Sequence, residues 1–117
     1  MRVYIAGPYG DSNTPEVIHE NVRRADRVSR VFMRLGHEVY CPHKMSWGWE
    51  KDTTLSLDDF ERLDSTFLTH WATHIYRIPG ASKGSDDEVS LAASFGISII
   101  PENYIHLELV DKEPNVC

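Results

Sequence analysis

Short apolar runs alternate with longer amphipathic stretches along this chain of 117 residues. The first run, Val3–Ala6, stops at a glycine and a proline, as a buried strand does where it enters a loop. Residues 38–41, 74–78 and 97–100 are predicted to be strands of the same kind, since each is followed directly by a proline. A fifth strand is predicted around Ile105–Val110.

A long amphipathic helix is predicted after the first strand. It begins at Thr14 and Pro15, a hydroxyl cap followed by a proline at the first helical position, and it ends at Gly36. Its apolar residues recur at helical spacing: Ile18, Val22, Ala25, Val28, Phe32 and Leu35.

Two shorter helices are predicted further along the chain. One covers about 56–70 and begins with a capping-box variant, a serine followed three residues later by an aspartate. The other covers 86–95, with Ser85 as its cap and Gly96 as its end. Residues 43–54 lack periodicity and are predicted to form a loop.

Strands that alternate with helices predict an α/β domain with a parallel sheet, right-handed crossovers and helices on both faces. The length fits a single domain over 1–117, with a periodic core over about 2–100. Ligands of such sheets bind beyond the carboxyl ends of the strands. That rule selects the loops that follow Ala6, Cys41, Ile78 and Ile100.

The net charge of −6 argues against a general binder of nucleic-acid polymers, because such binders neutralise phosphates with Lys and Arg. The two cysteines, Cys41 and Cys117, do not suggest a disulfide scaffold and favour a reducing compartment. The apolar run at 3–6 is too short for a signal-peptide core, and no run approaches the length of a membrane span. We therefore expect a cytoplasmic protein without a membrane partner.

Signals for cofactors and metals are weak. The loop 7–10, Gly-Pro-Tyr-Gly, lacks the spacing of a dinucleotide fingerprint and the lysine of a Walker loop, so it is either a substrate loop or a structural turn. His70 and His74 have no third metal ligand at a plausible spacing, and Cys41 with His43 are too few. No metal or organic cofactor is expected.

The arginines of the first helix are interleaved with acidic residues. Glu20 with Arg24 and Asp26 with Arg30 are spaced as i,i+4 pairs. This spacing predicts a solvated helix face rather than a nucleic-acid surface.

The segment 79–88 is the most informative part of the chain. A loop rich in serine and glycine runs into a helix N-terminus there, where free N–H groups and the helix dipole favour anions. Asp86, Asp87 and Glu88 follow, predicted in the first turn. These acids either stabilise the helix end or place one carboxylate in the cleft, and Glu88 is the best placed because apolar residues follow it.

Two further groups of candidate site residues have both a functional and a purely structural interpretation. Asp64 lies between Leu63 and Phe67 on or beside the apolar side of its helix, so it is either a site residue or a solvated aspartate. Trp47 and Trp49 either stack on a base or hold the loop together.

Taken together, these segments resemble the nucleoside 2-deoxyribosyltransferase-like superfamily. The resemblance rests on the opening Arg-Val-Tyr-Ile-Ala-Gly-Pro of 2–8, the amphipathic helix that ends Leu-Gly-His-Glu-Val at 35–39, and an aspartate in the second helix. It also rests on the pattern Pro79-Gly80-x-Ser82-x-Gly84-x-x-x-Glu88-x-x-x-Ala92-x-x-x-Gly96. It covers about residues 2–100, and the short bacterial and phage members are the most similar in appearance.

The resemblance implies a flavodoxin-like three-layer sandwich with four or five parallel strands, which cleaves an N-glycosidic bond through a glutamate nucleophile. By position, Glu88 matches the nucleophile, Asp64 the acid that handles the base, and Tyr4 the tyrosine that steadies the nucleophile. Ser82 and Gly84 match the phosphate-binding loop of the 2′-deoxynucleoside 5′-monophosphate N-glycosidases.

The first substrate loop of the family is matched by Gly7, Pro8 and Tyr9. Pro8 stands where the monophosphate hydrolases carry a phosphate-binding serine, and His74 stands where an aspartate commonly opens the third strand. The family also builds its pockets across a two-fold interface. The resemblance therefore implies a homodimer, or a tetramer of paired dimers, with Trp47, Trp49, Tyr104 and Ile105 as candidate contacts.

For the chemistry, we expect Glu88 at its helix N-terminus to be ionised at neutral pH and Asp64 in its drier setting to have a raised pKa. The partner would be a nucleoside or its 5′-monophosphate, with base, sugar, and hydrolysis or transfer left open. A ribonucleotide phosphoribohydrolase and a non-catalytic nucleotide-binding module remain as alternatives.

Overall fold

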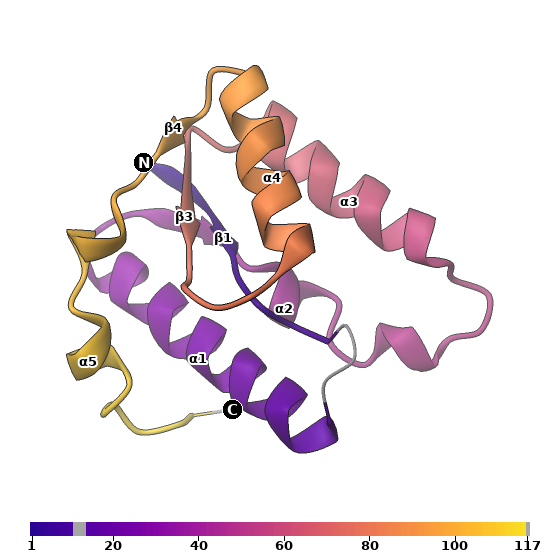
Figure 1. The fold of residues 1–117 in the computed structure, drawn as a ribbon, viewed down its shortest axis with the longest axis horizontal. Helices are drawn as coiled ribbons and strands as arrows, with labels where there is room; N and C mark the ends of the chain where they lie inside the picture. The colour runs from indigo at the N-terminus through magenta and orange to yellow at the C-terminus, as the bar shows by residue number, and fades with distance from the viewer. Residues whose placement is uncertain (11–13, 117) are drawn as a thin grey trace.

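The computed structural model describes residues 1–10 and 14–116 and shows one parallel sheet covered by helices. Its strands lie in the order β2-β1-β3-β4, with bounds β1 (Arg2–Ala6), β2 (Glu38–Tyr40), β3 (His74–Arg77) and β4 (Ser98–Ile99). α1 (Pro15–Arg34) covers one face, and α3 (Leu57–His70) and α4 (Lys83–Ser94) cover the other (Figure 1). The predicted α/β, flavodoxin-like three-layer sandwich is confirmed, with four strands.

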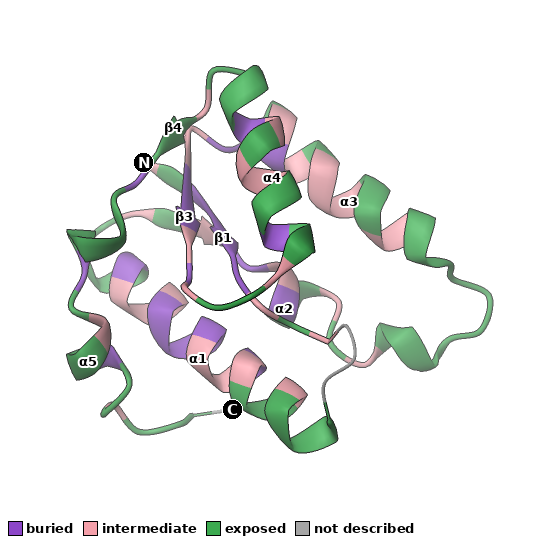
Figure 2. Ribbon diagram, viewed as in Figure 1, coloured by how far each residue is buried: buried purple, intermediate pink, exposed green. Residues whose placement is uncertain are grey.

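Two apolar cores fill the space between the layers, because successive side chains of a strand point to opposite faces. Val3 and Ile5 of β1 join the core on the α1 side, whereas Tyr4 and Ala6 join the core under α3 and α4. The purple segments of Figure 2 lie mainly in β1, β3 and α1. Tyr4, which the sequence singles out as a site residue, is therefore held rigidly in a packed layer with no exposed surface.

Two of the three predicted helix caps are confirmed. The Thr14 side chain accepts a hydrogen bond from the backbone of α1, and Ser56 forms both bonds of a capping box at the start of α3. The third prediction is wrong, because α4 is capped by Ser82, whose hydroxyl accepts from the backbone N–H of Ser85. An extended backbone at Ser82 allows the helix to begin three residues early, and Glu88 consequently lies in the second turn of α4 rather than the first.

The predicted fifth strand is also wrong. The structure has the 3₁₀ helix η2 (Glu102–Tyr104) and the short α5 (Leu107–Val110) in its place. Apolar and polar residues alternate over 105–109, which is the period of a strand, but the chain turns away from β4 after Ile100. Ile105 and Val110 are buried on the α1 side instead.

The stretch 43–54 is not a continuous loop. It contains most of α2 (Pro42–Met45) and the 3₁₀ helix η1 (Trp49–Lys51). The proline at the first position of α2 suits a helix start, since its missing N–H would be unpaired there in any case. The predicted strands 38–41, 74–78 and 97–100 are present but shorter.

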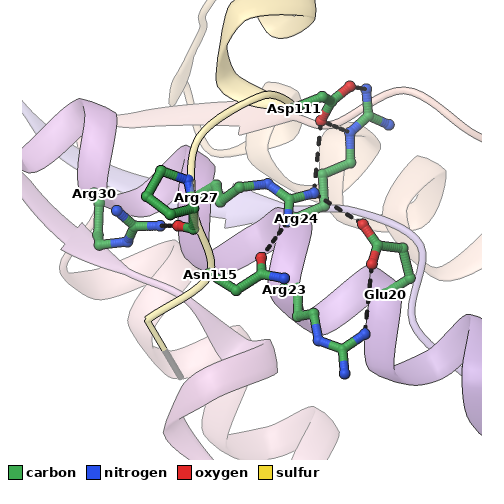
Figure 3. Close-up of polar contacts among 8 residues, drawn as sticks. Glu20, Arg23, Arg24, Arg27, Arg30, Asp111 and Asn115 are labelled. Carbon is green, nitrogen blue, oxygen red and sulfur yellow. Dashed lines mark hydrogen bonds and ion pairs between the residues drawn. The ribbon is translucent and has the colours of Figure 1, made fainter.

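The C-terminal segment is fastened along α1 by arginines (Figure 3). Arg24 binds Asp111 with two hydrogen bonds, and Arg27 donates to Asn115. Of the two predicted i,i+4 pairs, Asp26 with Arg30 is present, but Glu20 pairs with Arg23 and Arg27 rather than with Arg24.

The α1 arginine face is therefore not simply solvated: Arg27 is only 5% exposed, because the C-terminal segment lies over it. Among residues 1–10 and 14–116, no helix combines the length and hydrophobicity needed to cross a membrane.

Candidate active site

A cavity of about 860 Å³ opens at the carboxyl ends of the strands. It is lined from the loop after β1 by Gly7 and Tyr9, from α2 by His43, and from α3 by Asp64. The start of α4 supplies the opposite wall: Ser82, Lys83, Gly84, Ser85, Asp87 and Glu88. Three of the four loops selected from the sequence thus meet at one place. The loop after Ile100 does not reach it among the described residues, because β4 is the edge strand farthest from β2.

Tyr4 and Glu88 are in direct contact beneath this cavity. The Tyr4 hydroxyl donates a hydrogen bond to Glu88 Oε2, although the residues are 84 positions apart in sequence. The Tyr4 ring is fully buried, and burial together with the neighbouring carboxylates of Glu88 and Asp64 raises the pKa of its hydroxyl well above the ordinary value. Tyr4 is therefore a neutral donor that fixes one oxygen of Glu88.

A second tyrosine, Tyr40, hydrogen-bonds Asp64. The Tyr40 hydroxyl donates to Asp64 Oδ1 at 3.0 Å, across from β2 to α3. Burial raises the pKa of Asp64 to about 6, and the hydrogen bond from Tyr40 opposes that rise. A raised pKa for Asp64 was expected from its apolar neighbours in the sequence, and the shift has this direction.

The pKa of Glu88 differs from the one expected from the sequence. Burial is the main cause that raises its pKa to about 7; the hydrogen bond from Tyr4 opposes the rise, and the charges of Asp64 and Asp87 add to it. The expectation that a helix N-terminus keeps Glu88 ionised at neutral pH is therefore not supported, since a group with this pKa is about half protonated there. Glu88 lies in the second turn of α4 and not at the helix end.

Ser82 and Gly84 both line the cavity, but the Ser82 hydroxyl is already engaged. It accepts from the backbone N–H of Ser85 and donates to the Ser85 hydroxyl at 2.9 Å. Gly84 has no heavy atom within 4 Å of the place where a Cβ would stand, so it leaves open space at the helix start.

The first loop is packed closely against its neighbours. A Cβ on Gly7 would lie 3.0 Å from the Cβ of Ile78, so a side chain at position 7 would require Ile78, directly after β3, to shift. Pro8 does not line the cavity; its carbonyl accepts a hydrogen bond from His43 Nε2 at 2.8 Å. Tyr9 lines the cavity and stands edge-on to the His43 ring.

Sequence reasoning missed Tyr40 and His43 as site residues. His43 was considered only as a metal ligand, yet it is buried in the cavity wall, and burial lowers its pKa so that it is neutral. The signal for both was their place at the carboxyl end of the second predicted strand, where the ligand rule already pointed.

The aromatic candidates lie outside the cavity lining. Trp47 and Trp49 are each more than 40% exposed, and the Trp47 ring contacts Tyr9 edge-on. Of the interface candidates, Tyr104 is also exposed, but Ile105 is buried in the core and is withdrawn as a contact.

Within the described part of the chain, no cluster of three or more His, Cys, Asp or Glu side chains is arranged to hold a metal ion. Comparison with models of known protein families finds none that matches this sequence, and a search of curated proteins returns no match either. The function is therefore argued from the cavity itself.

Proposed function

We propose that this protein cleaves or transfers the N-glycosidic bond of a nucleoside or its 5′-monophosphate. The observation that carries the proposal is the pair of carboxylates, Glu88 and Asp64, that face one cavity and are each hydrogen-bonded by a buried tyrosine. Two carboxyl groups with different environments are what displacement at an anomeric carbon requires, one as nucleophile and one as acid. The resemblance to the nucleoside 2-deoxyribosyltransferase-like superfamily leads to the same assignment.

In the proposed reaction, a Glu88 oxygen forms a bond to C1′ of the sugar as the bond from C1′ to the base nitrogen breaks. The bond's electron pair leaves with the base, and Asp64 supplies the proton that neutralises it. Water then adds at C1′, gives its proton to Asp64 and releases Glu88 as a carboxylate. A second base in place of water makes the reaction a transfer. The scheme uses no metal or organic cofactor.

The charge of the cavity favours a nucleoside over a 5′-monophosphate. Five carboxyl side chains line it: Glu50, Glu61, Asp64, Asp87 and Glu88. Lys83 also lines it, but its ammonium is paired with Asp87 at 2.8 Å. Pro8, in place of a phosphate-binding serine, adds to the same preference. A doubly charged phosphate would meet repulsion here that a free 5′-hydroxyl avoids.

The test is incubation with a panel of nucleosides and their 5′-monophosphates, with free base measured by chromatography. We expect base release from at least one nucleoside, abolished by Glu88→Ala. The matched control is Asp86→Ala, two residues away on α4, because Asp86 pairs with Arg77 and does not line the cavity. An inactive wild type, or Glu88→Ala with wild-type turnover, would contradict the proposal. A wild type that binds nucleotides without releasing base would indicate a binding module instead.

A further inference from the structure

Tyr40 is placed to control Asp64 through three contacts. Its hydroxyl donates to Asp64 Oδ1, and its ring stacks on Phe67 with the two planes 8° apart and the centroids at 4.1 Å. Phe67 follows Asp64 by one helical turn on α3, so one tyrosine holds the same helix at two adjacent points. The ring also stacks on Tyr4, with the two centroids 5.6 Å apart. These two ring contacts hold the Tyr40 side chain in place beside Asp64.

The register of the sheet places the two tyrosines that hydrogen-bond the carboxylates side by side. Tyr4 and Tyr40 are direct partners in the parallel ladder of β1 with β2, and both belong to the core under α3 and α4. One hydroxyl holds Glu88 and the other holds Asp64. The spacing between the two donors is thus fixed by adjacent strands, which lie about 4.8 Å apart in a sheet.

We propose that Tyr40 is a positioning residue for the acid: by holding Asp64 Oδ1, it turns Oδ2 toward the leaving base and sets the protonation of Asp64. This inference rests on the proposed function. No substrate contact is assigned to Tyr40 itself, and it acts only through Asp64.

Several other groups surround the acid. Glu88 on α4 and the Tyr4 hydroxyl on β1 interact with Asp64 electrostatically. The same cavity is lined by Glu50, Glu61 of α3, Asp87 of α4, Lys83 and His43. Within the described residues, Tyr40 is the side chain that hydrogen-bonds Asp64. Because its hydrogen bond stabilises the ionised carboxylate, removal of the hydroxyl raises the pKa of Asp64.

The test variant is Tyr40→Phe, which keeps the stacked ring and removes only the hydroxyl. The matched control is Tyr76→Phe, since Tyr76 is also buried in the sheet and donates to the carbonyl of Glu102 on the opposite side. We expect kcat for a nucleoside substrate to fall by up to about 100-fold in Tyr40→Phe, the scale of a misplaced catalytic group. The whole pH–rate profile of this variant moves to higher pH, while Tyr76→Phe keeps the wild-type profile.

Two further measurements separate positioning from packing. Carbon-13 NMR titration of the free protein gives the pKa of the Asp64 carboxyl without turnover, and it rises in Tyr40→Phe only. In the Asp64→Asn background, Tyr40→Phe causes no further loss of kcat, because the group through which it acts is gone. An unmoved pH–rate profile and an unchanged Asp64 pKa would overturn the inference even in an active enzyme. Failure of the proposed function is seen separately, as a wild type that releases no base.

Discussion

Asp64 on α3 and Glu88 on α4 face the same cavity, and the charge of Asp64 raises the pKa of Glu88. Two carboxyl groups coupled in this way titrate as a pair, so their apparent pKa values describe the pair rather than either residue. The proposed chemistry needs one proton on the pair, with Asp64 protonated and Glu88 ionised. Because the pKa of Glu88 is the higher of the two, this is the less populated of the two singly protonated forms.

The pair predicts a bell-shaped dependence of kcat/KM on pH. Asp64 has a pKa of about 6 and Glu88 of about 7, so the singly protonated pair is most populated between these values. Below this window both groups are protonated and the nucleophile is lost; above it both are ionised and the acid is lost. Initial rates of base release from pH 4 to 9 measure the profile. Activity that stays constant from pH 7 to 9 would show that no acid of this kind takes part.

Glu88→Gln is expected to stabilise the protein at alkaline pH while it abolishes turnover. The folded pKa of Glu88 is raised to about 7 from an ordinary 4.5, so the folded state holds this proton where the unfolded state has released it. The free energy of unfolding therefore falls as pH rises from about 4.5 to 7, and the full cost is present above pH 7. The glutamine removes that cost and still accepts from Tyr4.

We expect a gain of roughly 2 kcal/mol in Glu88→Gln at pH 8 and little difference from wild type at pH 4. Urea denaturation at both pH values measures it. Equal stability of the two proteins at pH 8 would mean that Glu88 is solvated and ionised in the folded protein.

Ser82→Ala tests whether the helix cap also serves the ligand. Loss of an N-cap hydroxyl costs about 1 kcal/mol of stability. The matched variant is Ser56→Ala, which removes the cap of α3 at a residue that does not itself line the cavity. We expect both variants to lose similar stability in urea denaturation. With a nucleoside neither variant changes KM, whereas with a 5′-monophosphate only Ser82→Ala raises it, because the Ser82 loop is the one matched to a phosphate site. A KM for the monophosphate that is unchanged in both variants would reduce Ser82 to a structural cap.

A homodimer is proposed from the family resemblance, with the exposed Trp47, Trp49 and Tyr104 as candidate contacts. Aromatic side chains are enriched at the centres of protein interfaces, and a specific interface buries at least about 1,000 Å². Light scattering at micromolar concentration measures the mass, and Trp49→Ser is expected to weaken association. A fully active single-chain species would exclude both the dimer and a shared pocket.

The layers and most elements could be predicted from the sequence because they depend on periodicity and local caps. Val3–Ala6 is an apolar run that stops at Gly-Pro, and the helix that begins at Pro15 carries both apolar periodicity and a cap. The pattern failed over 105–110, where period-two alternation is also compatible with a short helix whose apolar residues pack on α1. Which surface a segment packs on is a tertiary property, and local alternation does not encode it.

In the candidate site too, features that depend on sequence position were predicted and features that depend on tertiary packing were not. Tyr4, Asp64 and Glu88 were predicted by position in the family pattern; the structure places Asp64 and Glu88 on one cavity and hydrogen-bonds Tyr4 to Glu88. Tyr40 was missed because its role depends on register with Tyr4 across β1 and β2, which no linear spacing reveals. The raised pKa of Glu88 was missed because it depends on burial and on the charge of Asp64, which come from the tertiary packing of α4.

The contact between Pro8 and Gly80 links the two loops at the rim of the cavity. Gly80 has a φ of 127°, and a Cβ added there would stand 2.8 Å from Pro8 Cγ. A side chain at position 80 would both meet Pro8 and be strained by this φ, so a smaller residue at position 8 does not free position 80 to change. An attempt to convert the protein to phosphate recognition can therefore replace Pro8, but it must keep Gly80.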